Sequence, residues 1–425
     1  MLETENNILE VVEQRPGYKK TKLGWVPNDW DVNQVKEYYD FKNGLNKGKE
    51  FFGYGTPIIN YKDVYAQQNI KRVNISGLVD VTKSEKERYS TKRGDVFFTR
   101  TSETILEIAY NSVLTEDISE GVFSGFVLRA RPKDADLINP EFSGYCFKTF
   151  QARKEIIRKS TYTTRALTNG SFLSEVIFAL PSLLEQKAIA NCLSTWDAAI
   201  TKQTQLIATK KQLKKALMQQ LLSGKKRLLG FDGEWEEKRI EDIASEYSKK
   251  NENNEEIEVL SCTKYDGLVP SLEYFGRQVF GDDLSKYKVV PKGYFAYATN
   301  HIEEGSIGYQ GFNKLGLVSP MYTVFKTDEN VDDDYLFRVL KSHRLIHDYN
   351  RFMEGSINRR GGLRWKNFRK IKIIIPKKEE QTAINKRLIA ADQEIELLNK
   401  QLEQLKNQKK GLMQQLLTGK KRLKF

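Results

Sequence analysis

The sequence predicts an α+β protein with two similar mixed α/β domains, each followed by one long helix. Three observations carry this prediction. The chain contains an internal repeat at an offset of 195 residues, as Pro181 and Pro376 illustrate. Each repeat closes on a segment of about 40 residues whose apolar positions recur at helical spacing. Ahead of these segments, short apolar runs alternate with Gly, Asn and Asp turns, which is typical of mixed α/β domains.

The internal repeat is the strongest of the three signals. Residues 181–228 align with residues 376–423 without a gap, and the final twelve residues of the two copies differ at a single position. A fainter similarity continues upstream, so that Trp30 and Trp235 open the two copies. The chain is therefore predicted to be two copies of one plan, with similar scaffolds and divergent interiors.

Each copy is predicted to close on a long helix that begins just after Pro181 or Pro376 and ends near Gly224 or Gly419. Proline commonly precedes or starts a helix, and glycine commonly ends one. One such helix alone could be an ordinary amphipathic core helix, but two in matching register favour pairing with each other. A pair joined through a folded domain could be antiparallel, which would place the two domains at opposite ends.

The predicted coiled-coil seam follows one heptad frame in both helices. Polar residues interrupt this frame at Gln203, Lys210 and Lys214 in the first helix and at Lys409 in the second. The apolar seam residues are Ile189, Leu193, Trp196, Ile200, Ile207, Leu217 and Leu221 in the first helix, and Ile384, Leu388, Ile395, Leu398, Leu402, Leu405, Leu412 and Leu416 in the second.

The domains ahead of the helices are predicted to hold several short strands and one helix each. The helices are expected at Pro140 to Arg158 and at Asp334 to Met353. The strands are expected at 96–98, 126–128, 176–180, 294–297, 322–325 and 371–375. The resulting division is an N-terminal extension (1–16), a first domain (17–180), a central helix (181–230), a second domain (231–375) and a C-terminal helix (376–425).

The composition indicates a basic globular protein. The formal net charge is +13 and the pI is near 9.2, which favours a polyanionic partner such as DNA, although many basic proteins only carry a solvated surface or bind RNA nonspecifically. Three scattered cysteines argue against a disulfide framework or a cysteine zinc site and for a reducing compartment. No apolar run is long enough to span a membrane, and the start of the chain is acidic, so a cytoplasmic location is expected.

Three elements resemble the specificity subunit of Type I restriction-modification enzymes, the HsdS family. The first is the opening stretch from Tyr18 to Trp30. The second is Glu185-Gln186 after Pro181, which recurs as Glu380-Gln381 after Pro376. The third is the Leu-Leu-Ser/Thr-Gly-Lys-Lys-Arg-Leu ending at 221–228 and 416–423. Together they cover the architecture of nearly the whole chain, whereas the variable interiors match only in outline.

The resemblance implies a non-catalytic DNA-recognition subunit in a bacterial or archaeal phage-defence system. Each variable domain would read one half of a split, asymmetric target in double-stranded DNA. The helices would act as a spacer and as the docking surface for two methyltransferase (HsdM-type) subunits, and motor-nuclease (HsdR-type) subunits would join for restriction. The resemblance also places methylation at adenine N6, with S-adenosylmethionine, Mg and ATP held by partner subunits and no cofactor or metal in this chain.

Candidate DNA-binding residues fall into two groups. Basic and amide side chains in polar loops are suited to base contacts: Arg100, Arg165, Asn300, Arg359 and Arg360. Any one of these could also be only a solvated side chain. Two basic clusters after the helices are suited to phosphates, or equally to favourable charge at helix C-termini: Lys225, Lys226 and Arg227, and Lys420, Lys421 and Arg422.

The alternative is an enzyme, either a DNA adenine methyltransferase or a nuclease. Residues 51–55 match the Phe-x-Gly-x-Gly of cofactor-binding methyltransferases, and residues 139–142 are one proline short of their Asn-Pro-Pro-aromatic site. The second copy has Asp332-Asp333-Asp334-Tyr335 at the matching place, so Phe142 and Tyr335 are interpreted as packing residues at a helix start.

Nuclease and metal chemistry have weaker support. Glu185-Gln186-Lys187 resembles the Glu-x-Lys of metal-dependent nucleases, but the second copy has Glu380-Gln381-Thr382, so a role in helix-start capping is favoured. His343 and His347 stand four residues apart and could bind zinc only with further ligands, so both are expected at the surface or facing DNA. A third class, a coiled-coil adaptor that never touches DNA, is disfavoured by the charge and by the paired variable domains.

Overall fold

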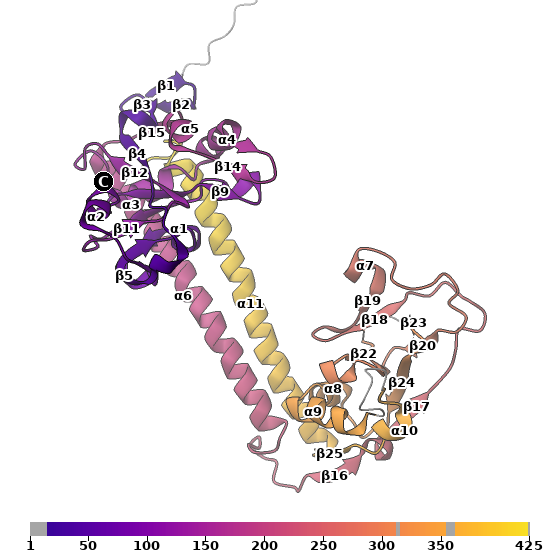
Figure 1. Cartoon of the computed structure of the whole chain (residues 1–425). Coiled ribbons are helices and arrows are strands. Elements are labelled where there is room, and N and C mark those ends of the chain that lie inside the picture. The colour runs from indigo at the N-terminus through magenta and orange to yellow at the C-terminus, as the bar shows by residue number, and fades with distance from the viewer. Residues whose placement is uncertain (1–14, 312–314, 354–361, 424–425) are drawn as a thin grey trace, which may run out of the picture. The chain divides into compact units, whose positions relative to one another are not determined.

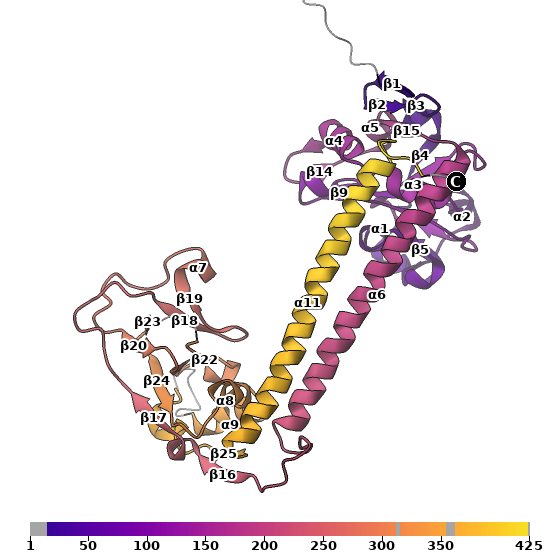
Figure 2. The same cartoon turned by 180° about the vertical axis from the view of Figure 1, so that it is seen from behind.

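The computed structural model describes residues 15–311, 315–353 and 362–423, and the chain divides into two compact units. Unit 1 comprises residues 1–204 with 400–425, and unit 2 comprises residues 205–399. Each unit therefore combines one α/β domain with parts of both long helices, as the labelled elements in Figures 1 and 2 illustrate.

The central sheet of unit 1 has five strands in the order β4-β12-β8-β10-β6. The β12 strand pairs antiparallel with both β4 and β8, and the short β6 strand pairs parallel with β10. The strands are β4 (Tyr39–Asn43), β12 (Val127–Pro132), β8 (Val96–Thr99), β10 (Asn111–Leu114) and β6 (Asn69–Ile70). Smaller sheets surround it: β1 (Tyr18–Thr21) with β2 (Gly24–Pro27), β15 (Ile177–Leu180) with β3 (Asp31–Gln34), and β11 (Val122–Phe123) with β5 (Phe52–Ile59) and β7 (Leu78–Val79).

Unit 2 repeats the plan with four antiparallel strands in the order β17-β24-β21-β22. These strands match β4-β12-β8-β10 in order, so the duplication extends to the sheet. They are β17 (Ala244–Tyr247), β24 (Tyr322–Thr327), β21 (Phe295–Ala298) and β22 (Ile307–Tyr309). The outer pairs are β16 (Glu236–Arg239) with β25 (Lys372–Ile375), β18 (Leu260–Thr263) with β19 (Gly267–Pro270), and β20 (Lys288–Pro291) with β23 (Leu315–Val318).

The two long helices have equal lengths and equivalent boundaries. Helix α6 spans Leu183–Leu221 and helix α11 spans Lys378–Leu416, 39 residues each. Both begin shortly after the predicted prolines. Both stop ahead of a left-handed glycine, Gly224 at φ +70° and Gly419 at φ +67°, a conformation that glycine adopts without a Cβ clash. The predicted helix boundaries are thus confirmed.

Within each unit the two helices run antiparallel. In unit 1 the first part of α6 contacts the last part of α11, where Gln203 Nε2 donates to Gln401 Oε1 at 3.3 Å and Lys409 pairs with Asp197. In unit 2 the last part of α6 contacts the first part of α11, where Lys210 pairs with Glu394. All fifteen predicted seam residues are buried or half-buried, and Leu193, Ile384, Leu388 and Leu416 are completely buried.

The single helix predicted in each domain is two helices, so this prediction was wrong in detail. Unit 1 has α3 (Pro140–Cys146) and α4 (Phe150–Lys159), and unit 2 has α8 (Asp333–Leu340) and α9 (His343–Phe352). Thr149 and Ser342 restart the second helix, because their hydroxyl oxygens accept the backbone N–H of Ala152 at 3.1 Å and of Leu345 at 3.4 Å.

The first helix of each pair begins as the sequence predicted. Phe142 and Tyr335 are fully buried, and the residue three positions earlier, Asn139 or Asp332, accepts their backbone N–H. One glutamine from each long helix holds the cap in place. Gln186 Oε1 accepts the N–H of Asn139 at 2.8 Å, as Gln381 Oε1 accepts that of Asp332 at 2.9 Å.

A buried glutamate at the start of each long helix joins the two repeats. Glu185, 1% exposed at its side chain, accepts the Trp30 indole N–H at 3.0 Å and two bonds from the Arg422 guanidinium at 3.0 and 2.7 Å. In unit 2, Arg227 binds Glu380 through two bonds of 2.6 Å. The sequence favoured a helix-capping role for these glutamates. In the structure each glutamate instead forms an ion pair with the arginine that follows the other long helix.

We expect Glu185→Gln to lower the free energy of unfolding of the full chain by about 1–3 kcal/mol, because a buried charge-assisted pair is removed while the side-chain volume is kept. Chemical denaturation measures the change. Glu155→Gln is the matched control, since Glu155 pairs with the exposed Arg158 at the surface and surface pairs contribute at most about 1 kcal/mol. Equal losses of stability in the two variants would contradict a special role for Glu185.

Candidate DNA interface

An exposed β-hairpin carries Arg165 in unit 1. Strands β13 (Thr161–Tyr162) and β14 (Ala166–Leu167) flank this arginine, which is exposed like its neighbour Tyr162. The β14 strand pairs with β9 (Thr101–Ser102), and the N–H of Thr168 donates to the carbonyl of Arg100 at 3.0 Å. The fold therefore brings two of the sequence-predicted segments, those of Arg100 and Arg165, to one edge of the unit.

Arg100 is less available than Arg165. Its side chain is half-buried, and Nη1 donates to the carbonyl of Gly125 at 2.8 Å. Arg100 is also one of the residues that line a hollow of about 480 Å³ next to β4. Arg100 is consequently placed to contribute charge to a groove, whereas Arg165 projects from a hairpin tip.

Unit 2 places its predicted segments in the same way. Arg100 directly follows β8, whereas Asn300 lies two residues after β21, and Asn300 is half-buried. The N–H of Leu363 donates to the carbonyl of Thr299 at 2.7 Å, which is the counterpart of the bond from Thr168 to Arg100. Arg359 and Arg360 lie outside the described residues.

The basic clusters after the helices divide into two kinds of residue. Arg227 and Arg422 direct their guanidinium groups at Glu380 and Glu185, which need a positive partner because they are buried. This occupation favours a structural role over phosphate binding for the two arginines. The remaining members are exposed, and their DNA contact stays a prediction: Lys225, Lys226, Lys420 and Lys421.

Two equivalent hollows lie beside the helix junctions of the two units. In unit 1 a space of about 950 Å³ is lined by Lys148 at the α3–α4 junction and by Lys410 of α11. In unit 2 a space of about 580 Å³ is lined by Lys341 at the α8–α9 junction and by Lys215 of α6. Burial, and then Lys409, lowers the pKa of Lys148 to about 8. Burial likewise lowers the pKa of Lys341.

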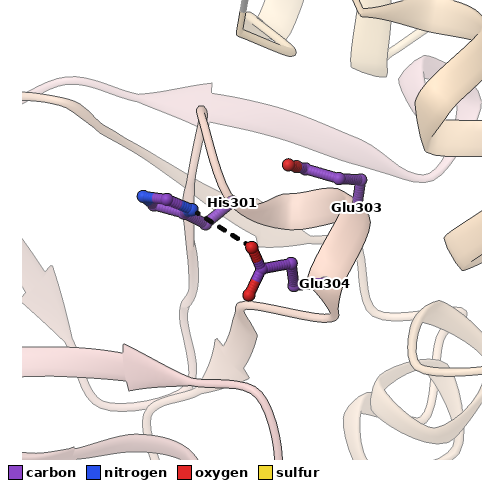
Figure 3. Close-up of side chains that lie close together, drawn as sticks. All are labelled: His301, Glu303 and Glu304. Atoms are coloured by element: carbon purple, nitrogen blue, oxygen red, sulfur yellow. Dashed lines mark ion pairs between the residues drawn. The ribbon is translucent and has the colours of Figure 1, made fainter. Parts of the chain in front are cut away.

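Metal-ligating side chains gather at one place in the described part of the chain. His301, Glu303 and Glu304 lie together around η6 (Ile302–Glu304), and the His301 ring faces the Glu304 carboxylate at 3.6 Å between Nδ1 and Oε1 (Figure 3). His301 and Glu304 are exposed, as are His343 and His347 on α9. Such exposed acidic groups are common without an ion, so the expectation that this chain holds no metal stays a prediction.

None of the helices in the described ranges is both long and apolar enough to cross a membrane. A duplicated α/β domain, with each copy packed on parts of the same two helices, defines a class of two-unit scaffold proteins. The model of the Type I restriction modification DNA specificity domain matches residues 27–210 and 232–407. The chain therefore belongs to the family of Type I restriction-modification specificity subunits.

Relatives and solved structures agree with this family. Two chains of Methanocaldococcus jannaschii described as type I restriction enzyme specificity subunits are similar over nearly their whole lengths. The one named MjaX is 26% identical over 96% of this chain and 97% of its own, and the one named MjaVIII is 24% identical over 94% of each.

Solved structures share the fold at low sequence identity. The HsdS subunit of Thermoanaerobacter tengcongensis has a TM-score of 0.53 at 14% identity, covering 93% of this chain and 98% of its own. A chain from a study of complex assembly in the type I R-M system has a TM-score of 0.60 at 15% identity, covering 93% and 99%.

We expect Arg165→Ala to weaken binding to one half of the DNA target by roughly 1–3 kcal/mol, the size of a bidentate base contact. Affinity measured on targets that vary in one half at a time tests this. Arg158→Ala removes an exposed arginine of α4 in the same unit and serves as the control. A uniform loss of affinity on all DNA would instead identify Arg165 as a phosphate contact.

Proposed function

We propose that this chain reads a bipartite, asymmetric sequence in double-stranded DNA, with one half assigned to each α/β domain. The duplication carries this proposal: two domains with the same strand order carry different side chains in equivalent loops, Arg100 and Arg165 in one and Asn300 in the other. Two unlike readers on one scaffold suit a target with two unlike halves. The net charge of +13 provides the general attraction to DNA.

We further propose that the chain directs adenine methylation and restriction without catalysing either. The methyltransferase-like residues are engaged in the fold: Asn139 caps α3, and the Phe142 ring is fully buried, so neither is placed to hold a flipped base. The nuclease-like Glu185 is bound by Trp30 and Arg422. S-adenosylmethionine, Mg and ATP would then belong to partner subunits. These occupied side chains weigh against the alternative of a methyltransferase or nuclease acting alone.

The partners in this proposal are two methyltransferase subunits and the motor-nuclease subunits of a cytoplasmic complex. Two equivalent sites would suit two copies of one subunit. The hollows beside Lys148 and Lys341 are equivalent in the repeat, and each is lined by a long helix as well as by a domain. Their cationic rims would suit an acidic segment of the partner.

Exchange of residues 31–175 for the same region of a related subunit should change one half of the methylated sequence and leave the other half unchanged. Each half depends on one domain, and the exchange retains Trp30, Glu185 and Arg422, which join this domain to the end of the other repeat. Methylome mapping in cells that carry the partner subunits reads both halves at once. A change in both halves would contradict the two-reader proposal, and a complex with no affinity for DNA would favour a coiled-coil adaptor.

We also propose that helix length sets the number of unread base pairs between the half-sites. One heptad is added to each helix, after Gln203 in α6 and after Leu398 in α11. Gln203 contacts Gln401, which lies within one turn of Leu398, so the two insertions face each other and keep the seam in register. Each adds about 10 Å of helix, against about 3.4 Å per base pair. The gap should lengthen by roughly one to three base pairs with unchanged half-sites, since DNA twisting absorbs part of the change. An unchanged gap at full activity would show that the helices do not measure it.

A further inference from the structure

A basic groove in unit 1 has no role in the functions considered so far. Its hollow of about 480 Å³ lies along β4 and the preceding turn η1 (Val35–Glu37) and is lined by four cationic side chains. Lys36 and Lys133 are exposed, whereas Lys42 and Arg100 are half-buried.

The cations of this groove are poorly neutralised by the protein. In the described part of unit 1, no ion pair joins a carboxylate to Lys36 or Lys42, and only the Glu175 carboxylate, paired with Lys159, interacts with Lys36 at longer range. Asp40 lies 3.9 Å from Lys133 with its side chain 73% exposed. Behind the groove, burial and the charges of Arg129, Arg88 and Arg131 lower the pKa of Lys42. A surplus of positive charge at a partly buried lysine is relieved when an anion binds.

Neutral polar groups complete the lining of the groove. They are Asn169, Ser171 and Ser174, at and within the short helix α5 (Gly170–Ser174). Asn169 Oδ1 accepts the N–H of Phe172, and the Ser174 hydroxyl donates to the carbonyl of Ser171. The Ser171 side chain is exposed. Cationic side chains together with an exposed hydroxyl form a setting for phosphate oxygens.

The charge of the groove is not required by the scaffold, because unit 2 has different residues at the same places. Lys133 N donates to the carbonyl of Tyr38, as Asp328 N donates to that of Ile243, so Lys133 corresponds to Asp328. Lys36 on η1 corresponds by the same register to Glu241 on η5 (Ile240–Asp242), which pairs with Arg369. Lys42 on β4 corresponds to Tyr247 on β17.

The groove adjoins the segment that carries the predicted reader. Arg100 lines the groove with its side chain, while its carbonyl accepts the N–H of Thr168 just beyond the Arg165 hairpin. A DNA strand read by that hairpin would run its backbone close by. This position favours DNA phosphates over other anions as the occupant.

We propose that the groove binds backbone phosphates of the DNA beside the half-site read by unit 1, through Lys36, Lys42 and Lys133. This inference rests on the proposed function. It assigns an electrostatic anchor to unit 1 that unit 2 does not match at the equivalent positions. Binding to the first half of the target would therefore depend more strongly on salt, and the three lysines would carry no sequence information.

The test is the salt dependence of DNA binding by the assembled complex of this chain with its methyltransferase subunits. Lys36→Ala/Lys42→Ala/Lys133→Ala should weaken binding roughly tenfold or more at moderate salt. It should also reduce the slope of log K against log salt concentration by about 0.9 for each phosphate that is no longer neutralised. The methylated sequence should stay the same. Because Lys42 is partly buried, Lys36→Glu/Lys133→Glu tests the same groove with exposed positions only.

The matched control is Lys20→Ala/Lys62→Ala/Lys83→Ala, which removes three exposed lysines of unit 1 outside the groove. An equal slope change in the control would overturn the proposal, because net charge alone would explain it. An unchanged slope in the groove variants, or an altered half-site, would overturn it as well. Failure of the unmodified complex to bind its target would instead contradict the proposed function.

Discussion

The arrangement of the chain depends on two buried glutamates that each require a positive partner from the other repeat. Glu185 stands at the start of α6 and is bound by Arg422, which follows α11. Glu380 stands at the start of α11 and is bound by Arg227, which follows α6. A buried carboxylate without its partner is costly, so neither unit is complete without the end of the other repeat. Gly419 approaches Pro27 and Trp30 as Gly224 approaches Trp235, which leaves little room for a side chain at either glycine.

Polar residues that interrupt the seam also form ion pairs between the two repeats. Asp197 pairs with Lys409 in unit 1, and Asp392, its counterpart in the repeat, pairs with Lys214 in unit 2. Each aspartate also accepts a bond from the neighbouring domain, from the Tyr145 hydroxyl at 2.7 Å or from Arg338 at 3.0 Å. Half-buried polar pairs of this kind fix the register of paired helices, because a shift would leave the charges without partners. Lys409 and Lys214, which weaken the heptad pattern, thus pair with the aspartates that tie the helices to the domains.

The sequence could predict the features that depend on local periodicity and missed those that depend on distant partners. Helix boundaries followed from Pro181, Gly224 and their counterparts. The break between α3 and α4 was missed because the apolar spacing continues across it, although Thr149 and Ser342 are favourable N-cap residues. The role of Arg422 could not be predicted, since its partner Glu185 lies 237 positions away in the chain. The groove was missed because Lys36, Lys42 and Lys133 come together only when β4 pairs with β12.

The two units separate what the scaffold needs from what a reader needs. Residues with a structural role recur in both copies. Gln186 and Gln381 accept the backbone N–H of the helix-cap residue in the same way, and Phe142 and Tyr335 are buried at the same place in the core. At exposed positions on the equivalent strands and turns, the side chains of the two copies carry opposite charges, as Lys133 and Asp328 do. Exposed charge contributes little to the stability of such a fold, so it is free to vary with the DNA that each unit meets. A chain built in this way can acquire a new target through its surface alone, provided that the glutamate and arginine pairs that join the repeats are kept.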